Sequence, residues 1–124
     1  MTNRPSKKEL FNKIRDAREA VADGRIEIAE AHIVAADAIE LDYDIENDLK
    51  DILLKILETI SPDHYKGLRP PDRSYKKQIK GLDLFAFVAA PSCFNCSVYL
   101  KFALAHNTFW LVSLHKDRPT RREE

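Results

Sequence analysis

The chain has 124 residues, which is enough for one domain with a buried core and too few for a second domain of ordinary size. Hydrophobic residues make up 44% of it and charged residues 32%, which is typical of a folded protein and excludes a disordered segment. Residues 1–60 hold 9 Lys and Arg against 14 Asp and Glu, a net charge of −5, and residues 61–124 hold 11 against 6, a net charge of +5. A basic second half suits a polyanionic partner, although ordinary surface charge explains the division equally well.

Neither the first residues nor any later stretch has the composition of a membrane segment. Residues 1–9 are polar and basic, and no run approaches the roughly 18 apolar residues that a membrane span needs. We therefore expect a cytoplasmic protein that does not bind membranes. The two cysteines, Cys93 and Cys96, fit a reducing compartment, lack the second pair that a zinc site requires, and are assigned no function. Because cofactor and metal motifs are missing from the sequence, we predict no cofactor and no metal.

Two segments near the start have apolar residues at helical spacing. The first begins at the capping-box pair Ser6 and Glu9 and ends at Asp23-Gly24. The second favours a helix from about residue 29 to about residue 41, although residues 26–28 alternate like a short strand. The apolar positions that define these helices are Leu10, Ile14, Ala17 and Val21 in the first, and Ala29, Ile33 and Ala36 in the second.

The strongest helical pattern comes third. Asp42 and Asp44 offer caps for it, and Ser61-Pro62 ends it and can begin a new turn. Its apolar positions are Ile45, Leu49, Ile52, Leu53, Ile56, Leu57 and Ile60. Residues 66–80 are polar, basic and rich in proline, so we predict a loop there.

The last part of the chain is rich in β-branched and aromatic residues. We predict strands over residues 82–89, 98–105 and 109–115, connected by residues 91–97 and 106–108. The fold class that follows is α+β, with N-terminal helices packed on a small C-terminal antiparallel β-sheet.

The predicted domain is single and spans the whole chain. Its helical part covers residues 1–60, its sheet part residues 61–117, and a tail residues 118–124.

The connection between the last two strands decides which side chains share a face, because side chains alternate along a strand. A two-residue turn after Ala105 would pair it with Thr108 and would mix apolar and charged side chains. A three-residue loop pairs Ala105 with Phe109 and places Tyr99 opposite His115. We favour this loop because it gathers the apolar side chains on one face of the hairpin, where they can be buried together. The predicted polar face holds Tyr99, Lys101, Ala103, Leu111, Ser113 and His115, and the apolar face holds Val98, Leu100, Phe102, Leu104, Trp110, Val112 and Leu114.

Four segments follow one another in the order and spacing of a known family. They are residues 35–44 (AADAIELDYD), 61–66 (SPDHYK), 98–101 (VYLK) and 111–115 (LVSLH). Through them, most of residues 26–117 resembles the MqsR family of bacterial toxins, which are messenger-RNA endonucleases with a RelE-like fold.

The resemblance implies the toxin of a type II toxin-antitoxin system. Such a protein is a metal-independent endoribonuclease, or mRNA interferase, that cleaves messenger RNA and binds a cognate antitoxin protein. Lys66 and Tyr99 match positions that carry the family's chemistry. Leu82, before Asp83, occupies the position of a family Gln, and His115 occupies that of the last family Lys.

RNA cleavage without a metal needs a base for the 2′-hydroxyl proton, a cation near the developing phosphorane charge and an acid for the leaving oxygen. Lys66, Tyr99 and His115 are the candidate catalytic residues. Lys66 and Lys101 suit the electrostatic role, while Tyr99 and His115 suit proton transfer, with acid and base not assigned. An equally simple hypothesis is that Tyr99 is an ordinary sheet residue and His115 a strand-end surface group.

Further basic residues are candidates for binding RNA, namely Lys101, Lys116, Arg69, Arg73, Lys76 and Lys77. Most belong to the polar loop, where Tyr75 could stack on an unpaired base, although a solvated basic loop explains them as well. The alternative for the whole protein is a catalytically silent RelE-like binding module that interacts with a protein or an RNA. Leu82 in place of Gln and the near-neutral pI of 6.9 favour this alternative.

Overall fold

The computed structural model describes residues 4–117; the tail predicted over residues 118–124 lies outside the described residues. In this part of the chain the fold is α+β, with three α-helices and a four-stranded mixed sheet. The elements are α1 Lys7–Ala22, β1 Ile26–Ile28, α2 Ala31–Leu41, α3 Ile45–Thr59, β2 Phe85–Ala89, β3 Val98–Ala105 and β4 Thr108–Lys116. Two short 3-10 helices, η1 Pro62–His64 and η2 Lys77–Ile79, lie between α3 and β2.

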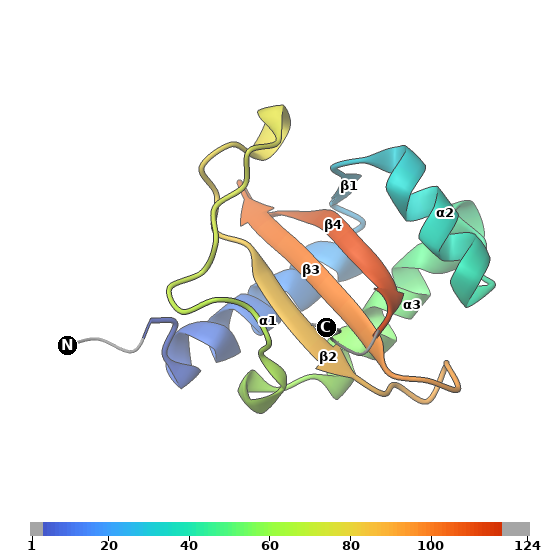
Figure 1. The fold of residues 1–124 in the computed structure, drawn as a ribbon, viewed down its shortest axis with the longest axis horizontal. Helices are drawn as coiled ribbons and strands as arrows, with labels where there is room; N and C mark the ends of the chain where they lie inside the picture. Colours follow the sequence, from blue (N-terminus) through green and yellow to red (C-terminus); the bar gives the residue numbers. More distant parts are fainter. Residues whose placement is uncertain (1–3, 118–124) are drawn as a thin grey trace, which may run out of the picture.

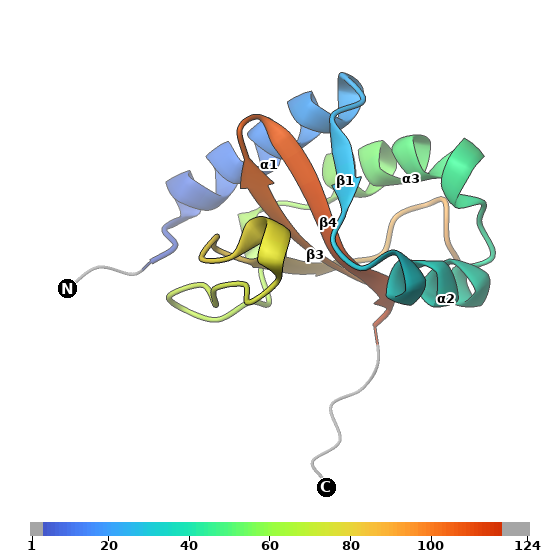
Figure 2. The same ribbon diagram turned by 90° about the horizontal axis from the view of Figure 1, so that it is seen from above.

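The strands are ordered β1-β4-β3-β2. β2, β3 and β4 form the predicted C-terminal antiparallel sheet, and β1 adds a strand that runs parallel to β4, which makes the four-stranded sheet mixed. A parallel pair needs a long connection, and here α2, α3, β2 and β3 all lie between the two strands in the chain. Helices α1 and α3 cover one face of the sheet, which we call the inner face (Figures 1 and 2). Among residues 4–117, no long helix lies over β2 and β3 on the opposite, outer face (Figure 1).

Helices α1 and α3 confirm the sequence patterns. Ser6 accepts a hydrogen bond from the backbone N–H of Glu9, at 3.1 Å, and Gly24 follows the end of α1 with a left-handed φ of 76°. Asp44 accepts hydrogen bonds from the N–H groups of Glu46 and Asn47 at the start of α3. The buried positions are Leu10, Ile14, Ala17, Ala20 and Val21 in α1, and Leu49, Ile52, Leu53, Ile56 and Leu57 in α3.

The second helix differs from its prediction. Residues 26–28 do form a strand, and the backbone N–H of Ala29 donates to the carbonyl of Leu111 at 2.9 Å, which delays the helix to residue 31. The buried side chains of α2 are then Val34, Ala38 and Leu41, and the predicted stripe through Ile33 is wrong, since that residue is 40% exposed. Because α2 has apolar residues on all sides, their spacing could not select the buried face.

The turn between β3 and β4 also corrects the prediction. It is the two-residue turn that pairs Ala105 with Thr108, and its residues His106 and Asn107 have φ of 51° and 63°, as a tight hairpin turn with two left-handed positions requires. A β-bulge at Val112 then shifts the register, so that Lys101 pairs with Ser113 whereas Phe102 pairs with Leu111.

The bulge explains why the predicted faces are right at one end of the hairpin and wrong at the other. Beyond it, Tyr99 lies opposite His115, as predicted. Between it and the turn, Leu111 is fully buried on the inner face, while Trp110 and Val112 belong to a second cluster and not to the inner core.

One large core joins the helical part to the sheet part. It lies between α1, α3 and the inner face, and its fully buried aromatic residues are Phe87, Phe102 and Phe109. The smaller cluster on the outer face combines Ala103 and Trp110 with residues 79–84 of the long segment before β2. This segment therefore covers one end of the outer face and leaves the other end accessible. Strand β2 begins at Phe85 and not at residue 82 as predicted, because residues 82 and 84 pack in this cluster.

Candidate functional site

The uncovered end of the outer face carries the polar residues of the hairpin. Strand pairing places Val88, Tyr99 and His115 in one row across β2, β3 and β4. The next row holds Lys101 and Ser113, again in register. Strand β3 thus brings a phenol and an ammonium group, and β4 brings an imidazole, onto one surface.

Tyr99 and His115 form the centre of this surface. Their rings are stacked, with centroids 5.0 Å apart and an angle of 16° between the planes. The Nζ atom of Lys101 lies 5.8 Å from the centroid of the Tyr99 ring, within the range of a cation–π interaction. Burial raises the pKa of Tyr99 above its usual value, so the phenol keeps its proton at neutral pH. Tyr99 is therefore a proton donor in this environment.

The hydrogen bond of His115 defines its tautomer. Its Nδ1 atom lies 2.7 Å from the backbone carbonyl oxygen of Lys116. A carbonyl oxygen only accepts hydrogen bonds, so Nδ1 carries the proton, and in the neutral ring the lone pair is on Nε2. Neutral His115 can therefore act as a base through Nε2.

Lys66 reaches the same face from a segment beside β2. Its backbone N–H donates to the carbonyl of Ala86 at 2.8 Å, and Tyr65 forms an isolated bridge with Phe87. The Tyr65 ring is buried against Phe87, with centroids 5.6 Å apart, so the alternation of extended chain places Lys66 on the outer face. Lys66 is exposed and lies in the row of Lys101, two strand spacings or about 10 Å away.

The predicted RNA-binding residues of the loop mostly have intramolecular partners. Arg69 donates from Nη1 to the carbonyl of Pro5 at 2.9 Å and lies over the Tyr65 ring. Two other basic residues of the loop form ion pairs, Arg73 with Asp83 and Lys76 with Glu30. These contacts attach the loop to the rest of the domain.

Exposed groups remain at the far end of the loop. Lys77 is exposed on η2, and Tyr75 is 91% exposed. Both belong to the segment that covers the Trp110 end of the outer face, whereas Tyr99 and His115 lie at the opposite end of the hairpin. The structure therefore does not bring Lys77 to the Tyr99–His115 pair.

Two further predicted positions lie away from the pair. Lys116 pairs with the buried Val98, so strand alternation places it on the other face from His115. Leu82, which was predicted to occupy the place of a glutamine, packs in the small cluster with Ile79.

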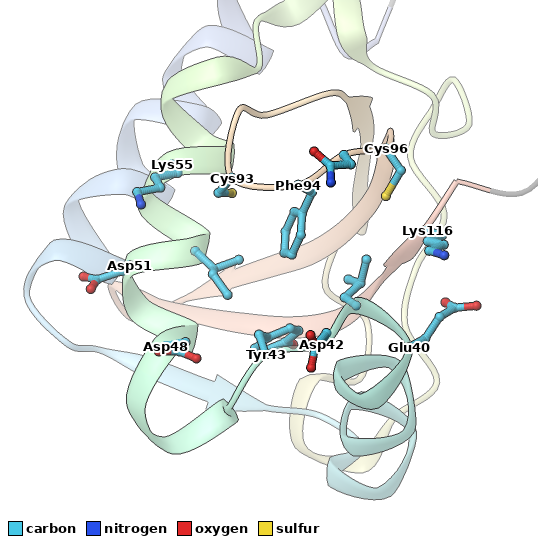
Figure 3. A pocket seen from close by; sticks show the side chains of 13 residues that line it. Glu40, Asp42, Tyr43, Asp48, Asp51, Lys55, Cys93, Phe94, Cys96 and Lys116 are labelled. Carbon is cyan, nitrogen blue, oxygen red and sulfur yellow. The ribbon is translucent and has the colours of Figure 1, made fainter.

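Sequence reasoning missed a cleft on the helical side of the molecule. Its volume is about 580 Å³, and it lies between the α2–α3 connection and the β2–β3 loop (Figure 3). Cys93 and Cys96 are free thiols that line it. The walls come from separate segments, so no local motif marks the cleft; the acidic stretch from residue 40 to residue 51 was the signal available.

Comparison of the chain with protein-family models finds no match, and comparison with curated proteins finds no match either. Within residues 4–117, no helix has the length and apolar character needed to cross a membrane.

Proposed function

We propose that this protein is a metal-independent endoribonuclease that cleaves messenger RNA, with a RelE-like fold, and that it acts in the cytoplasm as the toxin of a type II toxin-antitoxin pair. A cognate antitoxin protein is its partner. The observation that carries the proposal is the Tyr99–His115 stack, with Lys101 beside it and Lys66 on the same open sheet face. The succession of sequence segments that resembles the MqsR family supports the same function.

The geometry suits a division of roles in proton transfer. Nε2 of His115 takes the proton from the 2′-hydroxyl, whose oxygen attacks the neighbouring phosphorus. Tyr99 gives its proton to the departing 5′-oxygen, consistent with the raised pKa of its phenol. The products are a 2′,3′-cyclic phosphate and a 5′-hydroxyl, so atoms and charges balance without a co-reactant.

The two lysines stabilise charge. The phosphorane formed during attack carries more negative charge than the phosphodiester, and ammonium groups near it lower the barrier. Lys101 and Lys66 approach the outer face from β3 and from the segment beside β2, on one side of the stacked pair.

A second candidate, a catalytically silent RelE-like binding module, is favoured by one specific observation. Leu82 occupies the place of the family's Gln and packs in an apolar cluster, so that position has no polar group. In that case the outer face would bind a protein or RNA partner without cleaving it.

The proposal is tested by growth inhibition on induced expression. Lys66→Ala and Tyr99→Phe each remove one polar group from the outer face and should abolish inhibition while the protein stays folded. Tyr75→Phe makes the same chemical change as Tyr99→Phe on an exposed tyrosine away from the stack, and it should remain inhibitory. Full inhibition by both outer-face variants would reject the proposal.

A further inference from the structure

The cleft on the helical side has an aromatic centre. Phe94 extends from the β2–β3 loop toward Tyr43, which follows α2, and their ring centroids are 6.5 Å apart (Figure 3). Leu41 and Ile52 add apolar surface to the lining. The centre of the cleft is therefore two aromatic rings that a planar side chain can contact.

Carboxylates predominate around these rings. Asp48 and Asp51 of α3 lie on one side of the rings, and Glu40 and Asp42 lie at the C-terminal end of α2 (Figure 3). Two ammonium groups, those of Lys55 and Lys116, also line the cleft, so the carboxylates outnumber the cations. The cleft attracts a cation and repels a polyanion, in contrast to the basic outer face.

One of the two aromatic residues carries an unsatisfied polar atom. The hydroxyl oxygen of Tyr43 is buried, and within residues 4–117 it has no hydrogen-bond partner. Buried polar atoms in folded proteins nearly always have a partner, because an unpaired one costs stability.

The surface next to the cleft is apolar. Ile39 is 82% exposed and lies one helical turn before Asp42, and Ile33 and Ala36 are exposed on the same helix. Large apolar side chains at this exposure commonly mark an interaction site when they are contiguous with other binding features. Here the apolar helix surface leads to the acidic cleft.

We propose that this cleft is a docking site for a basic segment of a partner protein, in which an arginine side chain enters between the carboxylates and lies against Tyr43 and Phe94 while an adjacent apolar residue covers Ile39. The argument for this occupant is charge complementarity together with shape. A guanidinium group is planar, stacks on aromatic rings and pairs with carboxylates through two parallel hydrogen bonds.

Other occupants fit less well. A nucleic acid would bring its phosphates against four carboxylates. A metal ion needs several ligands close together, and the described residues 4–117 contain no group of three or more His, Cys, Asp and Glu side chains that could hold one. The site is separate from the Tyr99–His115 pair and does not depend on ribonuclease activity.

The test uses full-length protein labelled with nitrogen-15 and a short synthetic peptide of alternating leucine and arginine. Its control is the same peptide with citrulline, a neutral analogue of arginine. We expect saturable NMR shifts at the amides of Tyr43, Asp51 and Phe94 with the arginine peptide and binding at least about tenfold weaker with citrulline.

Two variants locate the site. Asp42→Asn combined with Asp51→Asn removes two negative charges and should weaken peptide binding about tenfold. Asp42 has a left-handed φ of 61°, which asparagine also adopts readily, so the fold should be retained. Glu58→Gln removes a charge from the exposed surface of α3 outside the cleft and should leave binding unchanged.

Three results would overturn the inference. The first is the absence of saturable binding. The second is equal binding by the wild type and the Asp42→Asn, Asp51→Asn variant, which would mean unspecific attraction. The third is concentration-dependent self-association that Ile39→Ser abolishes, since a second copy of the chain would then cover this surface.

Discussion

Replacing Tyr43 with phenylalanine should make the protein more stable, although it removes a polar group that could be expected to anchor the α2–α3 connection. The hydroxyl oxygen is buried without a partner in the described residues, so Tyr43→Phe removes a desolvation cost and loses no hydrogen bond. We expect a gain of about 1 kcal/mol at pH 7.

The same substitution has a defined pH dependence. Burial, with a smaller contribution from Asp37, raises the pKa of Tyr43 to about 12, from 10 in the unfolded chain. The folded protein holds this proton more tightly, so its stability is complete below pH 10 and is lost as the pH rises toward 12. At pH 11 the full shift would correspond to a loss of about 1.4 kcal/mol, and because Tyr43 is only partly buried, solvent screening reduces this to about 1 kcal/mol or less. Tyr43→Phe does not suffer this loss, so its advantage should grow by up to about 1 kcal/mol.

Urea unfolding of the wild type and of Tyr43→Phe at pH 7 and pH 11 measures the free energy of unfolding of each protein. Subtracting the wild-type value from the variant's at each pH cancels the contribution of the other titrating residues, which the two proteins share. A control, Tyr75→Phe, changes a tyrosine that is 91% exposed and should alter stability at pH 7 by less than about 0.5 kcal/mol. If Tyr43→Phe is destabilised by 1 kcal/mol or more at pH 7, the hydroxyl has a partner and the reasoning is wrong.

Other substitutions test the core, the turn and the bulge. Phe102→Ala should lose about 4 kcal/mol of unfolding free energy in urea titrations, because Phe102 is fully buried and stacks on Phe87 and Phe109; a loss below 2 kcal/mol would contradict this packing. Asn107→Val should lose about 1–2 kcal/mol, because a β-branched residue is strained at a φ of 63°, whereas Asn107→Gly should be nearly neutral; equal stability of both variants would mean a different turn. Deleting Val112 removes the bulge residue but leaves every other pair of β3 and β4 in register, so the NMR contact between the Tyr99 and His115 rings should persist, and loss of that contact in the folded variant would contradict the assigned register.

The sequence predicts those parts of the fold whose signals are local. Helices α1 and α3 follow from side-chain caps and a single apolar stripe, and both form within a few residues of the predicted bounds. The opposition of Tyr99 and His115 was also predicted, although the turn was wrong, because the bulge at Val112 restores the predicted register.

The remaining differences depend on contacts between distant residues. The exposed face of α2 is as apolar as its buried face, so only its packing against β4 decides that Val34 is buried and Ile33 is exposed. The ion pairs of the basic loop join residues far apart in the chain, as with Lys76 and Glu30, and no local pattern indicates which cations are engaged.

The cleft illustrates the same limit for the candidate sites. Tyr43 and Phe94 are isolated aromatic residues in the sequence, and α3 and β2 lie between them in the chain, so no local pattern predicts the contact of their rings.

Incubation of purified protein with a long RNA in EDTA, with the cut ends mapped, tests the central proposal most directly. The comparison is between wild type, Tyr99→Phe, His115→Gln and the matched control Tyr75→Phe. The proposed mechanism predicts defined cuts with cyclic phosphate ends by wild type and Tyr75→Phe, and activity reduced by a factor on the order of 100 or more in the other two. Absence of cleavage by folded wild-type protein, across several RNAs and pH values, would contradict the mechanism and favour the silent binding module.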